Sequence, residues 1–196
     1  MRQFIIVGQD APTTEEFSLD ALTGAGRMDL LARCVTASFL LSHGIREDVR
    51  THLVLADEFT VEFEGSKLRQ LNPDERSTAA LIQTALAERE EAIGHMAVET
   101  SPGVSISRLG FKAVLEKAAE GRTVCRLHEN GQPATTAEPP DDPVFVLSNH
   151  QELQPQYVDT LTDVSDNSIS LGPEPLHADH AITVAHNWLD TSGFVE

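Results

Sequence analysis

The C-terminal stretch of residues 167–190 constrains the fold of this chain most strongly, because three kinds of local structure follow one another in it without a spacer. It reads NSISLGPEPLHADHAITVAHNWLD. Ile169 and Leu171 alternate as in a strand, a Gly-Pro-Glu-Pro turn follows, and the apolar residues after the turn recur at helical spacing. Gly172 lets a ligand approach the backbone, and the two prolines fix φ and lack an N–H. α/β folds place ligands at strand ends of this kind, although a purely structural turn before a helix explains the same string.

The remaining periodicities indicate an α/β fold, with a mostly parallel sheet and helices on both faces. Strands are predicted at 2–8, 51–56, 61–65, 67–71, 123–127, 144–147 and 169–171. Helices are predicted at 28–43, 72–93, 111–120 and 177–190, with a short helix or an irregular crossover at 156–163. The Gly, Pro and Ser residues of 99–109 predict a loop. No internal repeat or linker is visible, and we expect residues 1–196 to form one domain.

The charge balance bears on whether the protein binds nucleic acid and on the salt concentration to which it is adapted. The chain carries 31 acidic and 14 basic residues, a net charge of -17, and only three of the bases are lysines. One interpretation is an acidic protein that avoids nucleic acid. The other is a halophilic protein in molar salt, where the Debye length is about 3 Å and a few placed arginines still bind RNA phosphates. The scarcity of lysine favours the second, and the candidate RNA contacts are Arg2, Arg33, Arg46, Arg69 and Arg108.

Several common classes lack support in the sequence. The longest early apolar run, residues 4–7, is too short for a signal peptide or a membrane span, so we expect a cytoplasmic protein without a membrane partner. Cys34 and Cys125 form neither a disulfide framework nor a zinc spacing. Dinucleotide, P-loop and hydrolase-elbow motifs are missing from the sequence. No metal is expected, because no cysteine or suitably spaced acid accompanies the C-terminal histidines, His177, His180 and His186.

Three predicted strand ends share polar and glycine-containing sequences: LHENG at 127–131, SNH at 148–150 and LGPEPL at 171–176. In a parallel sheet these ends emerge at one edge, where their backbone groups can surround an adenine-sized ligand. Together with GRMDLLARCV, LSHGIREDV, LNPDER and SRLGF, they resemble the archaeal-type tRNA pseudouridine N1-methyltransferases of the SPOUT class. The resemblance extends over nearly the whole chain.

The resemblance implies a deep C-terminal trefoil knot, S-adenosylmethionine bound by the knot loops, and a homodimer with active sites at its interface. It implies pseudouridine 54 in the T-arm of tRNA as the substrate. The family often has Gly at position 148 and Cys at position 181, so this chain adds a side chain beside the ligand and has no thiol there. The implied cofactor-binding residues are Leu127, Ser148, Asn149, Leu171, Gly172, Pro173, Glu174, Pro175, Leu176 and Ala181.

Arg27 and Asp29 stand at the start of the first long predicted helix, and two interpretations of them remain open. In the structural one, Asp29 complements the helix dipole and Arg27 is solvated. In the catalytic one, which the resemblance supports, Arg27 stabilises the developing imide anion. Asp29 either accepts the N1 proton of pseudouridine or, as a weak base, only orients the N–H and passes the proton through water. The apolar residues Phe39, Leu40 and Trp188 exceed what one sheet face needs, and predict that the 28–43 and 177–190 helices pack across a two-fold axis.

Alternative functions also remain open at this stage. The same fold class performs ribose 2′-O methylation, and nothing in the residues separates the two reactions. A non-catalytic dimeric RNA-binding module is the alternative from another class, and the intact LGPEPL loop argues against it. A metal-dependent hydrolase built on the histidines has the least support.

Overall fold

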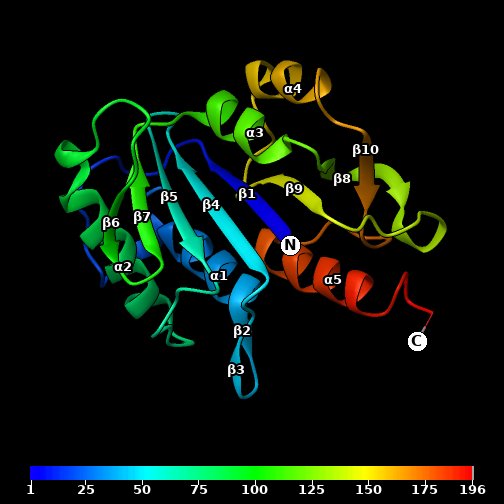
Figure 1. The fold of residues 1–196 in the computed structure, drawn as a ribbon, viewed down its shortest axis with the longest axis horizontal. Coiled ribbons are helices and arrows are strands. Elements are labelled where there is room, and N and C mark those ends of the chain that lie inside the picture. Colours follow the sequence, from blue (N-terminus) through cyan, green and yellow to red (C-terminus); the bar gives the residue numbers. More distant parts are fainter. Residues whose placement is uncertain (196) are drawn as a thin grey trace.

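A computed structural model describes residues 1–195, which contain an eight-stranded sheet in the order β10-β8-β9-β1-β4-β5-β7-β6 (Figure 1). Neighbouring strands from β10 to β4 run parallel, whereas the pairings from β4 through β5 and β7 to β6 are antiparallel. The predicted α/β fold with a mostly parallel central sheet is confirmed. The strands are β1 (Arg2–Gly8), β4 (Val49–Leu55), β5 (Phe59–Glu64), β6 (Val98–Ser101), β7 (Val104–Ser107), β8 (Thr123–Pro133), β9 (Pro143–Ser148) and β10 (Asn167–Ser170).

Helices cover both faces of this sheet, as predicted. α1, α2 and α5 pack on one face and α3 and α4 on the other, so that each face has its own apolar core (Figure 1). None of the helices in residues 1–195 is long and apolar enough to cross a membrane. The helices are α1 (Met28–Phe39), α2 (Glu75–Ala87), α3 (Phe111–Ala119), α4 (Pro155–Thr162) and α5 (Ala178–Asp190).

The central strand β1 explains how the two cores are separated. Its run Phe4-Ile5-Ile6-Val7 is fully buried. Phe4 and Ile6 belong to the core under α1, α2 and α5, and Ile5 and Val7 belong to the core under α3 and α4. A strand buried on both faces is apolar at every position rather than at alternate ones. The short apolar run that excluded a membrane span is therefore the middle of the sheet.

Helix α1 ends at Phe39, four residues before the predicted end. Leu40 adopts an extended conformation and pairs with Ile45, so that β2 (Leu40–Leu41) and β3 (Gly44–Ile45) form a separate antiparallel ribbon. The apolar residues keep a helical spacing through this ribbon, but the backbone there forms paired strands in place of a helix. Helix α2 is also shorter than predicted and begins at Glu75, where Asp74 caps it by accepting a hydrogen bond from the Ser77 N–H.

Two sequence predictions on the antiparallel side of the sheet are wrong. No strand forms at 67–71, because β5 pairs with β4 on one side and β7 on the other. The predicted loop at 99–109 instead contains the β6–β7 hairpin, whose turn holds Gly103 at a φ of 77°. The Pro and Gly residues that indicated a loop form only the turn of that hairpin.

The predicted strand end at 127 is also different in the structure. β8 continues to Pro133, and its register with β10 passes from Arg126–Ser168 directly to Gln132–Ile169. Residues 127–131 therefore have no register partner in β10 and bulge out of the pairing. Gly131, at the end of the bulge, lies directly against the backbone of Ile169. Only glycine fits there, because a Cβ at this position would lie 2.6 Å from that backbone.

Helices α1 and α5 pack against each other within one chain, which removes the residue argument for a two-fold interface. Phe39 and Trp188 are both 0% exposed and belong to the core that α1 and α5 form with the sheet. Leu40 is only partly buried. The apolar residues that the sequence analysis assigned to a dimer interface are thus mostly buried inside one chain, because α2, α5 and the sheet together enclose α1.

Candidate functional site

Residues 126–129 in the middle of β8, the carboxyl ends of β9 and β10, and the start of α5 surround a cavity of about 470 Å³. This size suits a nucleoside-containing cofactor, since sites for such molecules measure roughly 300–1,000 Å³. The structure brings nine of the ten predicted cofactor-binding residues into its lining, and Pro173 is the exception. The nine are Leu127, Ser148, Asn149, Leu171, Gly172, Glu174, Pro175, Leu176 and Ala181.

Asn149 is the buried polar side chain of this lining. It is 6% exposed, and neither its side-chain nitrogen nor its oxygen has a hydrogen-bond partner among residues 1–195. Its position is fixed, because its backbone N–H donates to the Val7 carbonyl at 3.2 Å. An unpaired buried amide costs about 1–3 kcal/mol. The pocket wall thus offers one donor and one acceptor to a molecule that can pair with both.

Gln9, which follows β1, holds the loop after Asn149, and sequence reasoning missed it. Its side-chain nitrogen donates to the Glu152 carbonyl at 2.9 Å, and its oxygen accepts from the Gln154 N–H at 2.8 Å. Asp10 accepts a further hydrogen bond from the Gln151 side chain at 2.6 Å. The available signal was the position of Gly8-Gln9-Asp10 at the carboxyl end of a buried central strand.

Gly172 lies in the wall contributed by the loop between β10 and α5. A Cβ at this position would meet nothing closer than the Glu174 carbonyl oxygen at 3.7 Å, so the space beside it is open. The Ser170 hydroxyl donates to the Gly172 carbonyl at 3.0 Å and fixes the loop at its start. The predicted close approach of a ligand to this backbone is therefore sterically feasible.

Charged side chains also line the pocket. His128, in the bulge of β8, and Glu152, in the loop after β9, approach each other within 3.4 Å. Arg126 also lines the cavity, and its guanidinium forms no hydrogen bond or ion pair with any other residue in 1–195, although sequence reasoning did not select it. An unpaired guanidinium in a lining of this kind is available to a carboxylate or a phosphate.

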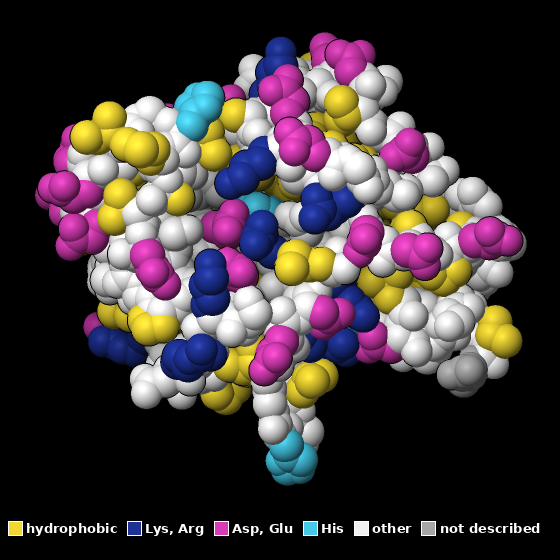
Figure 2. Space-filling view, viewed as in Figure 1, with side chains coloured by type: hydrophobic (Ala, Val, Ile, Leu, Met, Phe, Trp, Pro, Cys, Tyr) yellow, Lys and Arg dark blue, Asp and Glu magenta, His cyan; other side chains and the backbone are white. Residues whose placement is uncertain are grey.

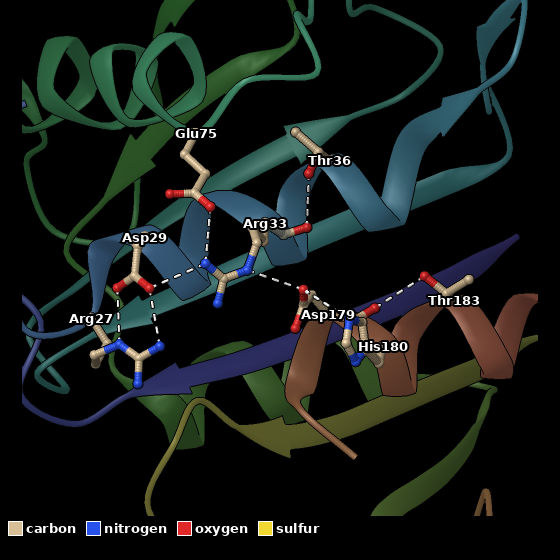
Figure 3. Close-up of polar contacts among 8 residues, drawn as sticks. All are labelled: Arg27, Asp29, Arg33, Thr36, Glu75, Asp179, His180 and Thr183. Atoms are coloured by element: carbon tan, nitrogen blue, oxygen red, sulfur yellow. Dashed lines mark hydrogen bonds and ion pairs between the residues drawn. The ribbon is translucent and has the colours of Figure 1, made fainter. Parts of the chain in front are cut away.

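Arg27 and Asp29 form a paired unit outside the pocket lining. Arg27 is in the left-handed region at a φ of 61°, and its Nε and Nη2 donate to the two Asp29 oxygens at 2.9 and 3.0 Å (Figure 3). Asp29 is 6% exposed. Burial alone raises its pKa, and the hydrogen bonds and charges of Arg27 and Arg33 outweigh that effect, so the pKa lies below its usual value. Such a carboxylate is a weak base that is well suited to fixing a guanidinium.

The three C-terminal histidines do not converge. His177 lines the pocket, and His180 is exposed with its Nε2 3.8 Å from Asp179. His186 is buried and contacts the Ser38 carbonyl and Arg2, each at 3.0 Å. Within residues 1–195, no three His, Cys, Asp or Glu side chains are grouped so that they could hold a metal ion.

Four of the five arginines predicted to contact RNA are already bonded to carboxylates of this chain. Arg2 and Arg46 share Asp190, and Arg33 contacts three acids. Arg108 donates to Glu90 at 2.9 Å, whereas Arg69 reaches only backbone carbonyls. Figure 2 shows Lys and Arg side chains, with Asp and Glu side chains among them, over the middle of the face that it displays. This pairing weakens the prediction for all but Arg69.

A mostly parallel α/β sheet with a ligand-sized pocket at its strand ends defines an α/β cofactor-binding protein. The profile of a family described as "Putative SAM-dependent RNA methyltransferase" matches residues 1–194. The chain belongs to this family.

The curated relatives agree with this assignment, and a solved structure shares the fold. The chain is 64% identical to a tRNA (pseudouridine(54)-N(1))-methyltransferase of Haloarcula marismortui over 99% of this chain and 98% of that one. It is 62% identical to the Haloferax volcanii protein of the same name, with the same coverage. The crystal structure of Archaeoglobus fulgidus Nep1 bound to S-adenosylhomocysteine shares the fold, with a TM-score of 0.64, 12% identity, and coverage of 97% of this chain and 98% of that one.

Proposed function

We propose that this protein transfers a methyl group from S-adenosylmethionine to N1 of pseudouridine 54 in tRNA. The observation that carries the proposal is the identity of 64% to a methyltransferase of that name over nearly the full length of both chains. The pocket supports it independently, because its size and its unpaired Asn149 amide fit a nucleoside cofactor. The sequence resemblance to pseudouridine N1-methyltransferases points to the same reaction.

The lining suits the adenosyl end of the cofactor. Leu127, Leu171 and Leu176 present apolar surface to a purine face, and Asn149 can pair with the adjacent donor and acceptor on an adenine edge. Ser148 adds a hydroxyl beside that edge, and Ala181 leaves room without a thiol. Arg126 is placed to bind the carboxylate of the methionine part. When bound, S-adenosylmethionine supplies an electrophilic methyl group.

The Arg27–Asp29 pair supplies the electrostatic part of the reaction in this proposal. As N1 of pseudouridine forms a bond to the methyl carbon, the bond from that carbon to sulfur would break and S-adenosylhomocysteine would leave. The N1 proton would pass to water, and negative charge would develop on the imide of the base. Arg27 faces this charge, and preorganised positive charge of that kind is often the largest catalytic contribution. Asp29 fixes Arg27 and orients the N1–H through water, because both of its oxygens are already held by arginines.

Three structural features belong to the same proposal. The first is a deep trefoil knot. The 171–177 loop lines the pocket beside residues 126–129 of β8 and the end of β9, and α5 then packs on α1, an arrangement that threading of the C-terminus would produce. The second is a single domain over residues 1–196, supported by two cores that share one sheet. The third is a cytoplasmic location, where the tRNA substrate is found. An experimental structure traced through residues 123–190 tests the threading.

The protein is also proposed to be a homodimer. Support comes from the family resemblance and from Leu176, which is 41% exposed at the pocket rim and gains cover if a second copy packs there. The chain mass is 21.4 kDa, so light scattering in molar salt is expected to give about twice that value. A mass of one chain would contradict the dimer.

Two measurements test the activity itself. Titration calorimetry with S-adenosylhomocysteine is expected to show binding to the pocket. Incubation of pseudouridine-containing tRNA with S-adenosylmethionine, followed by nuclease digestion and mass spectrometry, is expected to give N1-methylpseudouridine. A 2′-O-methylated nucleoside would assign the ribose reaction instead, and binding of tRNA without any methylated product would indicate an RNA-binding module.

A further inference from the structure

The guanidinium of Arg33 lies between three carboxylates that come from three different helices (Figure 3). It donates to Asp29 in α1 at 3.1 Å, to Glu75 in α2 at 3.0 Å and to Asp179 in α5 at 3.1 Å. Burial by itself lowers the pKa of Arg33, and the three carboxylates together raise it above its usual value. One side chain therefore crosslinks the three helices that cover this face of the sheet.

Asp179 connects this crosslink to the cofactor pocket. It stands in the first turn of α5, is 8% exposed, and is flanked on the helix by Ala178 and Ala181, which line the cavity. Its Oδ2 accepts from Arg33, and its Oδ1 is buried without a partner among residues 1–195. The bond to Arg33 is thus the one hydrogen bond that orients this carboxylate within the described chain.

At its other end, the crosslink reaches the Arg27–Asp29 pair. Asp29 Oδ2 accepts hydrogen bonds from both Arg27 and Arg33, so the two arginines are joined through one carboxylate oxygen. The Asp179 charge also acts on Arg27 and contributes to raising its pKa, after the larger effect of the Asp29 hydrogen bond. Arg27, Asp29, Arg33 and Asp179 therefore form one connected electrostatic unit.

We propose that Arg33 is a positioning residue for methyl transfer, which holds the Arg27–Asp29 pair in place against the pocket wall through Asp179. This inference rests on the proposed function. Methyl transfer requires the target nitrogen and the methyl carbon to meet in line, and a displacement of about 1 Å caused by a change away from the chemistry can cost about 100-fold in rate. The α1 and α5 elements carry the two halves of the site, and Arg33 ties them together.

A direct role for Arg33 in RNA binding predicts a different kinetic signature. Its guanidinium is surrounded by Asp29, Glu75 and Asp179, and a phosphate would have to displace one of them. Loss of a phosphate contact raises the KM for tRNA and reduces its salt dependence. Loss of a positioning contact lowers the rate at saturating tRNA and leaves cofactor affinity unchanged.

The test uses the full chain and the substitution Arg33→Met, which keeps an apolar stem and removes the guanidinium. The single-turnover rate at saturating tRNA and cofactor is expected to fall about 10- to 100-fold. The affinity for S-adenosylhomocysteine by calorimetry and the KM for tRNA are expected to change less than about threefold. Arg33→Lys is expected to restore part of the rate, since an ammonium reaches one carboxylate but not three in a fixed fork.

Arg89→Met is the matched control, because Arg89 binds Glu15 and the Leu86 carbonyl just after the end of α2, and none of these residues lines the pocket. It removes a comparable long-range arginine–carboxylate contact and is expected to leave the rate at the parental value. Both variants are assayed well below their unfolding midpoints, so that lost stability does not register as lost rate. Equal slowing in the two variants would reduce Arg33 to a structural role and overturn the inference.

A double-mutant cycle shows whether Arg33 acts through Asp179. The combined Arg33→Met and Asp179→Asn variant is expected to be no slower than the slower single variant, whereas independent contributions multiply. A parental rate in Arg33→Met, multiplied losses in the cycle, or a raised KM for tRNA with an unchanged saturated rate would each overturn the inference. A parental protein that binds S-adenosylhomocysteine but methylates no pseudouridine would overturn the proposed function as well, and this outcome is visible before any variant is made.

Discussion

The carboxylate of Asp29 accepts one hydrogen bond from Arg27 on each of its oxygens, at 2.9 and 3.0 Å, while Arg33 binds one of the same oxygens at 3.1 Å. Both Asp29 oxygens therefore hold hydrogen bonds before any substrate arrives. The sequence left two roles for Asp29, either to accept the N1 proton or to orient the N–H and pass the proton through water. The hydrogen bonds from Arg27 and Arg33 favour the second role within the proposed function.

The substitution Asp29→Asn is expected to slow methyl transfer by about 10²–10⁴-fold. An amide keeps the shape of the side chain, but its NH₂ group faces an Arg27 donor and its charge is lost. S-adenosylhomocysteine affinity is expected to remain at the parental value, because Asp29 does not line the pocket. Single-turnover assays and calorimetry check the two expectations. A parental rate would remove Asp29 from the reaction, and lost cofactor binding would make its role structural.

The substitution Gly172→Val is expected to abolish S-adenosylhomocysteine binding while the thermal midpoint changes little. A Cβ at 172 meets only the Glu174 carbonyl at 3.7 Å, so the branched side chain fills the pocket and not the protein core. Calorimetry and thermal unfolding measure the two effects. Unchanged affinity would show that the ligand does not pass close to this loop.

Gly131→Ala is the matched control for that substitution. Its added Cβ would lie 2.6 Å from the Ile169 backbone, which cannot move without disturbing the pairing of β8 with β10. We therefore expect a lower thermal midpoint together with weaker binding. Destabilisation by Gly172→Val to a similar degree would mean that Gly172 is required for the fold and not for the cofactor.

His186 is expected to make the protein less stable in acid. Ser38 offers a carbonyl, which can only accept, so Nε2 of His186 donates to it and Nδ1 accepts from Arg2. Burial, followed by the charges of Arg46 and Arg2, lowers the pKa of His186 to about 3. The unfolded chain binds this proton near pH 6.5, so stability is complete above that value and falls as the pH approaches 3.

The loss attributable to His186 is at most of the order of 5 kcal/mol over that range. Urea unfolding at a series of pH values measures it. His186→Gln is expected to be less stable at neutral pH and to show a flatter dependence on pH than the parental protein. An identical slope in His186→Gln would assign the acid sensitivity to other groups. Glu62 is one such group, because the hydrogen bond and charge of His52 and the charge of Arg50 overcome its burial and lower its pKa to about 2.

Salt is expected to stabilise the fold strongly. With 31 acids against 14 bases, like charges repel over the surface, and molar salt shortens the Debye length to about 3 Å. The thermal midpoint is therefore expected to rise by about 10 °C or more between about 0.1 M and about 3 M KCl. Thermal scans at increasing KCl check this, and a midpoint independent of salt would contradict the adaptation to high salt inferred from the composition.

Local patterns in the sequence predicted much of the framework of this protein. A continuous apolar run gave β1, helical periodicity gave the cores of α1, α3 and α5, and the LGPEPL loop indicated a ligand site. These features depend on residues that are close in the chain, and hydrophobic period and turn residues report such structure directly. The resemblance to a known family added the cofactor-binding residues, nine of which the structure brings together.

Only the tertiary structure decided which charged side chains form ion pairs within the molecule and which do not. Nothing in the sequence indicates that Arg33 meets Glu75 and Asp179, 42 and 146 positions away, or that Gln9 supports the loop after Asn149. Phe39 and Trp188 looked like interface residues until the packing of α1 on α5 buried them. Such contacts join elements that are distant in the chain and depend on how helices and strand ends are placed around one sheet, which local periodicity does not encode.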